Sequence, residues 1–265
     1  MKLRLKSKPK KQIFTFWEPK EKIPGYLKLC IRTWKKFLPE YNINIMNFKS
    51  TKDYIGEYMF SRIVSKNLPL PIQADAIRVA LLNQSGGIWM DPDTIITNSD
   101  FLKTLENYEL VMIGGKKMQH IGFIIASNNS DIINNWLKEI LKKVKIYNQF
   151  NNKNINIGIK WSFLGNMIID KLLQNSTDKK FFRLDRNKIF AFPEVKFFEN
   201  SKLNMKQRYI KLYFSNGEPK IILEKVKGLI MLHNSWTPIK YKKLTETKFL
   251  KENILLSKLL SKILK

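Results

Sequence analysis

Two carboxylates that stand two residues apart, Asp91 and Asp93, are the residues of this sequence best placed to do chemistry. Before them, Gly86 and Gly87 interrupt a helical pattern, and three apolar residues follow as a short buried strand. Residues two apart in an extended backbone point to the same side, so both carboxylates face one space. Such acids repel each other unless a cation lies beside them, and hard oxygen ligands suit Mg²⁺ or Mn²⁺ with phosphate. The pair predicts a metal-diphosphate site, although Asp-x-Asp alone is more often a solvated turn or a helix cap.

A helix is predicted directly upstream, over residues 71–82, because apolar residues recur there at helical spacing. Asp75 and Arg78 are three residues apart and share a face that differs from the apolar stripe. From spacing alone, an ordinary ion pair within the helix is the simpler interpretation of these two residues. A role in ligand binding is the alternative.

These residues combine into one pattern, Ala74-Asp75-x-x-Arg78-x-x-x-Leu82-x-x-x-Gly86-Gly87-x-x-x-Asp91-x-Asp93. The pattern resembles the signature of glycosyltransferases that carry a sugar-binding Asp-x-Asp region. It is similar to the family that contains bacterial capsular polysaccharide synthesis proteins and fungal initiating mannosyltransferases, and the large glucosylating toxins share it. The resemblance implies an α/β fold with a GT-A-type, Rossmann-like nucleotide-binding sheet flanked by helices.

The resemblance also implies an activity, that of a metal-dependent retaining glycosyltransferase with a nucleotide-diphosphate sugar as donor. We expect a UDP-sugar donor and a surface glycan or polyprenyl-linked acceptor in capsular polysaccharide synthesis. In this family Asp75 and Arg78 would hold the donor sugar, Asp91 would reach the ribose, the sugar or the metal, and Asp93 would bind Mn²⁺ or Mg²⁺. Gly87 would let the backbone approach the donor. No residue is an evident nucleophile, so we expect a front-side displacement.

An aromatic pair ends the first predicted strand, Gln12–Trp17. In enzymes that this sequence resembles, the end of this strand supports the nucleotide base. Phe16 and Trp17 are the candidates, and stacking of a base on such a ring contributes about 1–3 kcal/mol. Packing in the core is the alternative for either ring.

A second candidate segment follows the apolar strand Gly228–Leu232. A lone histidine at a strand end, such as His233, is on its own more often structural than a ligand. The resemblance instead makes His233 a third metal ligand, and imidazole is an acceptable ligand for Mn²⁺. It also places Asn234, Ser235 and Trp236 against the diphosphate, where the indole N–H of the tryptophan is a hydrogen-bond donor.

Net charge is the unusual feature of the composition, with 48 Lys and Arg against 22 Asp and Glu, formally +26. Such a charge favours an anionic partner. The single cysteine, Cys30, excludes an internal disulfide framework and fits a buried thiol in a reducing compartment. No apolar run is long enough to span a bilayer, and no secretory signal follows the basic start. We expect a cytoplasmic protein, with peripheral attachment to the inner face of the plasma membrane as a further expectation.

Three parts are predicted along the chain: a flexible basic arm at 1–11, a single catalytic domain at 12–240 and a basic amphipathic helix at 241–265. The C-terminal helix has two open interpretations. Its apolar face lies in an anionic membrane interface, or it packs on the catalytic domain or a second subunit.

The remaining elements are predicted from periodicity and from turn residues. The first three predicted elements of the chain are a strand, a helix and a strand, and this order predicts a right-handed βαβ unit. Helices are expected at 23–39, 54–64, 131–147 and 163–173, strands at 41–47, 110–115 and 121–126, and irregular or strand-like structure at 188–198 and 208–215.

Two rival functions follow from the charge and from the C-terminal segment. The first is a nucleic-acid-binding protein, but lysines are spread along the chain and no base-reading motif is evident. The second is a membrane-surface scaffold without catalysis, which the complete acidic pattern disfavours. Generic, salt-sensitive DNA affinity is expected from the charge alone, so no specific nucleic-acid partner is predicted.

Overall fold

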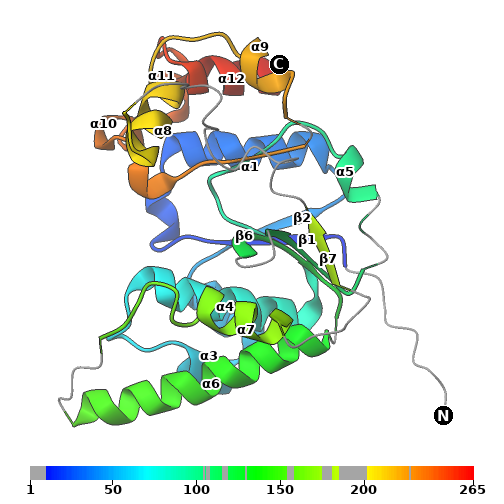
Figure 1. The fold of residues 1–265 in the computed structure, drawn as a ribbon, viewed down its shortest axis with the longest axis vertical. Coiled ribbons are helices and arrows are strands. Elements are labelled where there is room, and N and C mark those ends of the chain that lie inside the picture. The colour runs from blue at the N-terminus through cyan, green and yellow to red at the C-terminus, as the bar shows by residue number, and fades with distance from the viewer. Residues whose placement is uncertain are drawn as a thin grey trace. The chain divides into compact units, whose positions relative to one another are not determined.

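The computed structural model describes residues 10–103, 105, 108–114, 119–128, 130–153, 158–174, 181–184, 202–226 and 228–265. The chain divides into two compact units that interleave in sequence (Figure 1). The first comprises the described residues within Met1–Lys20, Asn42–Asp91 and Leu105–Leu184, and the second those within Glu21–Tyr41, Pro92–Thr104 and Asp185–Lys265. Most of the predicted basic arm and the whole of 188–198 lie outside the described residues.

A six-stranded mixed sheet forms the centre of the first unit, in the order β2-β1-β3-β6-β5-β7. Its strands are β1 (Gln12–Phe16), β2 (Asn42–Met46), β3 (Gly87–Met90), β5 (Leu110–Gly114), β6 (Gln119–Ala126) and β7 (Phe181–Leu184). The β1 strand is parallel to both β2 and β3, whereas β6 is antiparallel to β3 and β5. The predicted α/β class and the parallel pairing of the first two strands are therefore confirmed.

Helices of the first unit gather on one face of this sheet (Figure 1). They are α2 (Phe48–Ile55), α3 (Glu57–Ile63), α4 (Leu70–Ser85), α6 (Asp131–Asn152) and α7 (Asn166–Gln174). The α4 helix contacts β1 and β3 on one side and α6 on the other. It is therefore buried nearly all round, Asp75 and Arg78 included, and not only along the apolar stripe that its sequence predicts.

Glycines set two breaks in the chain, one between α2 and α3 and one after α4. The helix predicted at 54–64 is two helices, because Gly56 takes φ +83° between α2 and α3. The predicted break at Gly86 and Gly87 is confirmed, with φ of +66° and +110°. A Cβ at Gly86 would lie 2.6 Å from the Asn128 nitrogen, and one at Gly87 would lie 2.8 Å from the Gln12 oxygen. Only glycine allows α4 to turn into β3 this closely.

The second unit is built around α1 (Gly25–Phe37), close to the helix predicted at 23–39. On one side α1 holds β4 (Thr94–Ile96), because Trp34 Nε1 donates to the Thr94 oxygen at 2.7 Å and Ile96 N donates to Thr33 Oγ1 at 2.9 Å. The β4 strand pairs antiparallel with β8 (Leu229–Met231), which confirms the strand predicted at 228–232. Cys30 is a buried free thiol, as expected.

Two short helices complete the connections of the second unit, α5 (Asp100–Lys103) and α9 (Lys220–Leu223). A longer helix, α8 (Met205–Tyr213), contradicts the prediction of irregular or strand-like structure at 208–215, because residues 208–213 are helical. Its start is fixed by a reciprocal capping box between Asn204 and Gln207. Tyr209 and Tyr213 are one helical turn apart and both are buried, and this spacing is the helical signal.

The C-terminal segment also differs from the prediction of one helix at 241–265. It forms α10 (Ile239–Lys242), α11 (Glu246–Leu250) and α12 (Leu255–Leu264). The apolar face of α12 is buried and contacts α1, α8 and α11 within the unit. Of the two interpretations, packing on the protein is the one that the structure supports for this face. No helix among the described residues is long and apolar enough to cross a bilayer.

Truncation of the α12 face tests this packing. Leu259 is fully buried, so Leu259→Ala should lower the free energy of unfolding by about 2–5 kcal/mol in urea denaturation. Leu264→Ala on the same helix is the matched control, because that side chain is only half-buried and its loss should cost distinctly less. Equal effects of the two variants would contradict the described packing.

Candidate functional site

A buried cation between two acids forms the candidate site of the first unit. Nη2 of Arg78 lies 3.0 Å from Oδ1 of Asp91 and 3.5 Å from Oδ1 of Asp75. Nη1 of Arg78 donates to the Ile121 carbonyl oxygen at 2.7 Å. Arg78 therefore links α4 to the end of β3 and to β6, which goes beyond an ion pair within one helix.

Trp89 also contacts Asp91 and Arg78. Its Nε1 donates to the same Oδ1 of Asp91 at 2.8 Å, and the Arg78 guanidinium lies over its ring, 4.8 Å from the centroid. Asp91 N donates to the Gly122 oxygen at 2.8 Å, which continues the ladder between β3 and β6. The Asp91 side chain stays 30% exposed, while those of Asp75 and Arg78 are below 10%. Asp91 is thus the acid of this cluster that a ligand can reach.

Burial changes the pKa of one acid of the cluster, Asp75. Burial raises the pKa of Asp75 to about 7, the Arg78 charge opposes this rise, and the Asp91 charge adds to it. The Asp75 carboxyl therefore changes its charge near neutral pH.

Gly165, just before α7, packs directly against Asp75. A Cβ at this position would lie 2.5 Å from Oδ2 of Asp75 and 2.6 Å from Cδ1 of Ile121. Only a residue without a side chain fits beside the carboxylate in this position. The sequence analysis did not identify Gly165, since it is remote from the acidic pattern and carries no local signal.

A second candidate group, in the second unit, contains Asp93 and the segment after β8. Leu232 N donates to the Asp93 oxygen at 3.0 Å, so the β4–β8 pairing extends by one residue beyond the strands. Asn234 N donates to Oδ2 of Asp93 at 2.8 Å. The structure thereby brings Asp93 beside the segment that contains His233, as the resemblance implies.

Aromatic residues surround this second group. The His233 and Trp236 rings are 4.1 Å apart between centroids, and His233 N donates to the hydroxyl of Tyr209 at 3.2 Å. The Tyr26 hydroxyl donates to Oδ1 of Asn234 at 2.7 Å. Burial raises the pKa of both tyrosines, and the Asp93 charge adds to the rise, so both remain hydrogen-bond donors. Neither tyrosine was identified from the sequence, because each is far from Asp93 along the chain.

The remaining predicted site residues differ in how far they are buried and in what they contact. Phe16 is buried in the core against Phe48, with ring centroids 5.4 Å apart, which agrees with the packing alternative. Trp17 follows β1 and is only half-buried, so its ring remains the candidate for base stacking. Gly87 packs on Gln12 at the opposite end of β3 from Asp91, and this contact is a structural reason for the glycine. Ser235 is exposed.

A metal ion fits the chemistry of the second group. Asp93 and His233 offer a carboxylate and an imidazole, a donor set that suits Mn²⁺. In the part of the chain that the structure describes, no group of three or more His, Cys, Asp or Glu side chains is arranged to hold a metal. Ions that bind with substrate phosphates need only one or two protein carboxylates, because phosphate and water complete the shell.

Comparison with known families gives the decisive match. Residues 2–181 match the family described as "Capsular polysaccharide synthesis protein". The chain belongs to this family. The family resemblance predicted from the acidic pattern is thus confirmed, and the match includes Asp75, Arg78, Asp91 and Asp93. The segment 232–236 lies beyond the matched residues.

Three solved structures are similar to this family member. "PaToxG Glycosyltransferase" has 19% identity and a TM-score of 0.42, with 64% of this chain and 70% of that chain covered. "A glycosyltransferase involved in the glycosylation of the major capsid of PBCV-1" has 11% identity and a TM-score of 0.39, covering 88% and 97%. "The glycosyltransferase GlyE in Streptococcus pneumoniae TIGR4" has 12% identity and a TM-score of 0.39, covering 96% and 64%. No curated protein sequence matches the chain.

The raised pKa of Asp75 predicts a pH dependence of stability. Between its ordinary pKa of about 4 and about 7, Asp75 binds a proton in the folded protein that it releases on unfolding. Stability should therefore fall as pH rises through this range, by at most about 1.4 kcal/mol per pH unit. In urea denaturation, the stability of Asp75→Asn should not show this fall with rising pH. The variant Asp53→Asn, at an exposed position, should still show it. An unchanged pH profile in Asp75→Asn would contradict the assignment.

Substitution of Gly165 tests the fit beside Asp75. Gly165→Ala should lower the free energy of unfolding by about 1–3 kcal/mol, because the added methyl group displaces the carboxylate or the start of α7. The control is Gly158→Ala, where an added Cβ has no atom within 4 Å. Thermal denaturation of both variants is the measurement, and equal effects would argue against the close contact.

Proposed function

We propose that this chain is a glycosyltransferase of polysaccharide synthesis that uses a nucleotide-diphosphate sugar, with a UDP-sugar as the expected donor. The acceptor in this proposal is a surface glycan or a polyprenyl-linked precursor. The observation that carries the proposal is the cluster of Asp75, Arg78 and Asp91 at the end of β3, in a member of the capsular polysaccharide synthesis family. Ends of strands are the usual ligand-binding edge of such sheets.

Each residue of the cluster has a role in donor binding. The partly exposed Asp91 carboxylate accepts hydrogen bonds from hydroxyl groups of the ribose or the sugar. Arg78 holds Asp91 in place and adds a positive charge for the diphosphate. Asp75 fixes Arg78 from the α4 side and so acts on the donor through Arg78. Trp17 offers a half-buried ring for the base.

The divalent ion belongs to the second group in this proposal, with Asp93 and His233 as the residues that would hold it. Bound there, Mn²⁺ or Mg²⁺ would neutralise the charge that develops on the departing diphosphate. The Asn234 backbone N–H orients the Asp93 carboxylate. The Trp236 indole N–H and the exposed Ser235 hydroxyl supply hydrogen-bond donors for phosphate oxygens.

The proposal includes retention of the anomeric configuration, which would come about through a front-side displacement. Asp75 and Asp91 both contact Arg78, an arrangement that suits holding hydroxyl groups better than attack on a sugar carbon. The acceptor hydroxyl would then approach from the side of the leaving diphosphate, with its proton passing to a phosphate oxygen.

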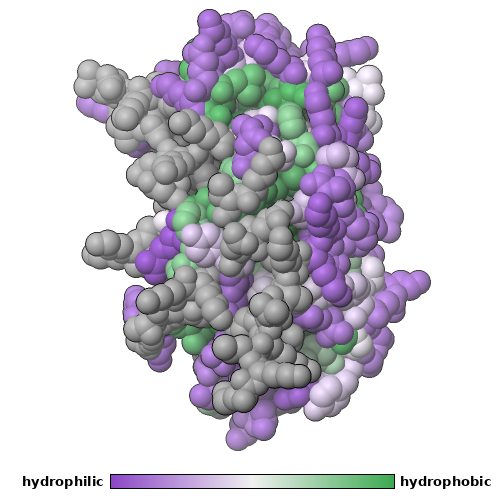
Figure 2. All heavy atoms as spheres, turned by 90° about the vertical axis from the view of Figure 1, so that its right-hand side faces the viewer, coloured by the Kyte–Doolittle hydropathy of each residue, from purple (hydrophilic) through white to green (hydrophobic). Residues whose placement is uncertain are grey.

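The cytoplasmic face of the membrane is the proposed location, as nucleotide-sugar chemistry and the positive charge both favour it. The alternative of a nucleic-acid-binding protein rests on the same charge. In the view of Figure 2 hydrophilic residues, purple, cover much of the described surface, and hydrophobic residues, green, gather in its upper part. The lysines are spread along the sequence without a base-reading motif, which disfavours a specific nucleic-acid site.

Loss of Asp93 tests the proposed metal role. Asp93→Asn keeps the size of the side chain and removes its charge, so Mn²⁺-dependent hydrolysis of a UDP-sugar should fall by about 10²-fold or more while the protein stays folded. Asp53→Asn is the control for a lost surface carboxylate and should keep full activity. A panel of UDP-sugars serves as substrate. An active Asp93→Asn enzyme would remove the metal role of this acid.

A further inference from the structure

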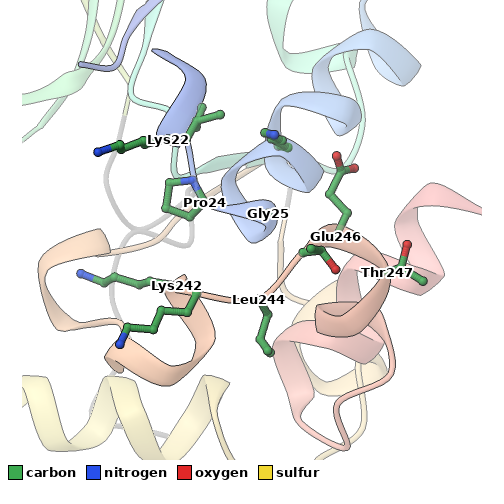
Figure 3. Close-up of a pocket in the computed structure, with 11 residues that line it drawn as sticks. Lys22, Pro24, Gly25, Lys242, Leu244, Glu246 and Thr247 are labelled. Atoms are coloured by element: carbon green, nitrogen blue, oxygen red, sulfur yellow. The ribbon is translucent and has the colours of Figure 1, made fainter. Parts of the chain in front are cut away.

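A pocket of about 420 Å³ opens in the second unit, apart from the residues assigned to the donor (Figure 3). Residues before and in the first turn of α1, from Lys22 to Lys28, form one wall, and the segment 242–247, from the end of α10 to the start of α11, forms the other. This volume accommodates a group larger than a single ion.

Positive charge dominates the lining. Four lysines line the pocket: Lys22, Lys28, Lys242 and Lys243. The acid among the lining residues, Glu246, is paired with Arg32 outside the pocket at 3.3 Å. In Figure 3 Lys22 and Lys242 extend to one side of the pocket, and Glu246 lies on the other. The pocket therefore has a net positive charge on one side.

The two walls are held in direct contact. A Cβ at Gly25 would lie 2.5 Å from the Leu244 oxygen and 2.6 Å from the Glu246 nitrogen, so the start of α1 packs on the backbone of the opposite segment. Behind this contact, the rings of Tyr26 and Phe249 stack with centroids 5.8 Å apart. The pocket is consequently a built feature of the fold and not a gap between mobile side chains.

Lys242 connects the pocket to the proposed metal group of the same unit. Partial burial lowers the pKa of this lysine, and the Asp93 charge opposes that effect. The geometry agrees, because Tyr26, next to the lining residue Gly25, donates to Oδ1 of Asn234 at 2.7 Å, and Asn234 N donates to Oδ2 of Asp93 at 2.8 Å. A ligand in the pocket would lie next to the site at which the donor's diphosphate departs in the proposed function.

We propose that this pocket binds a phosphate or diphosphate group, and that this group belongs to the acceptor. Ammonium groups are strong donors to phosphate oxygens, and the hydroxyls of Thr245 and Thr247 add further donors. The assignment to the acceptor rests on the proposed function, because the donor's diphosphate is already assigned to Asp93 and His233. A polyprenyl-linked acceptor carries such a group between its lipid and its sugar.

Binding of inorganic pyrophosphate tests the pocket directly. The pocket variant Lys28→Gln/Lys243→Gln is compared with Lys251→Gln/Lys262→Gln, which removes the same charge from exposed positions of the same unit. Calorimetry at fixed ionic strength should show binding weakened by about tenfold or more in the pocket variant and nearly unchanged in the control. Equal losses, or no binding by the unsubstituted protein, would overturn the proposal.

Two further arms identify the source of the phosphate. Vesicles of phosphatidylglycerol that bind more weakly to the pocket variant than to the control would assign the pocket to a lipid-borne phosphate. Displacement of pyrophosphate by UDP with Mn²⁺ would overturn the acceptor assignment in favour of the donor.

Hydrolysis of a UDP-sugar separates this proposal from the proposed function. The pocket variant should keep Mn²⁺-dependent hydrolysis, because its two lysines are not assigned to the donor, and a loss there would overturn the acceptor assignment. Hydrolysis that is missing in the unsubstituted protein would contradict the proposed function, whereas pocket-dependent pyrophosphate binding would still stand.

Discussion

Burial of the Arg78 charge between two carboxylates is the constraint on which the first unit depends. A guanidinium away from water is stable only when its hydrogen bonds and its charge are matched, and removal of one partner of a buried pair costs about 3–5 kcal/mol. Arg78 meets this demand through its two Nη atoms, with Asp75 on its own helix, Asp91 at the end of β3 and the Ile121 carbonyl on β6, whereas its Nε is buried without a hydrogen-bond partner among the described residues. The same contacts that stabilise the charge fix the reachable carboxylate of Asp91, so stability and ligand binding share one arrangement.

In the second unit, the acid whose position is fixed by its surroundings is Asp93. Asp93 is held by backbone pairing between β4 and β8 and by the N–H of Asn234. Buried tyrosines pack around the segment of His233, and their hydroxyls stay protonated because burial and the Asp93 charge raise their pKa values. Asp93 lies beside the segment that contains His233, and a carboxylate with an imidazole is the donor set on which the proposed divalent ion rests. The short covalent link from Asp91 to Asp93 is the sequence feature that relates the two groups.

Local patterns in the sequence were sufficient for much of this description. The glycine break at the start of β3 and the strands β2, β5, β6 and β8 are all found where the residues predict them. The spacing of Trp89 and Asp91 also contained the information that the indole faces the acid, since residues two apart in a strand share a side. This inference was available from the sequence and was not made.

Long-range contacts account for what the sequence did not predict. The close packing of Gly165 on Asp75 depends on a segment 90 positions further along the chain, and no local signal indicates it. The hydrogen bond of Tyr26 to Asn234 likewise joins distant segments. Amphipathic spacing at the C-terminus predicted an apolar face correctly, but it does not specify whether a bilayer or α1 covers that face. The start of α11 has a local cause, because the Thr245 side chain accepts from Lys248 N and caps the helix.

The central claim is that Asp93 and His233 hold a divalent ion together with a nucleoside diphosphate. Electron paramagnetic resonance of Mn²⁺ titrated with the protein measures this directly, with and without UDP. The account predicts that the protein removes the signal of free Mn²⁺ more effectively than UDP alone, and that Asp93→Asn or His233→Ala abolishes the difference. A protein that leaves the Mn²⁺–UDP equilibrium unchanged, or variants that bind as well as the unsubstituted chain, would contradict it.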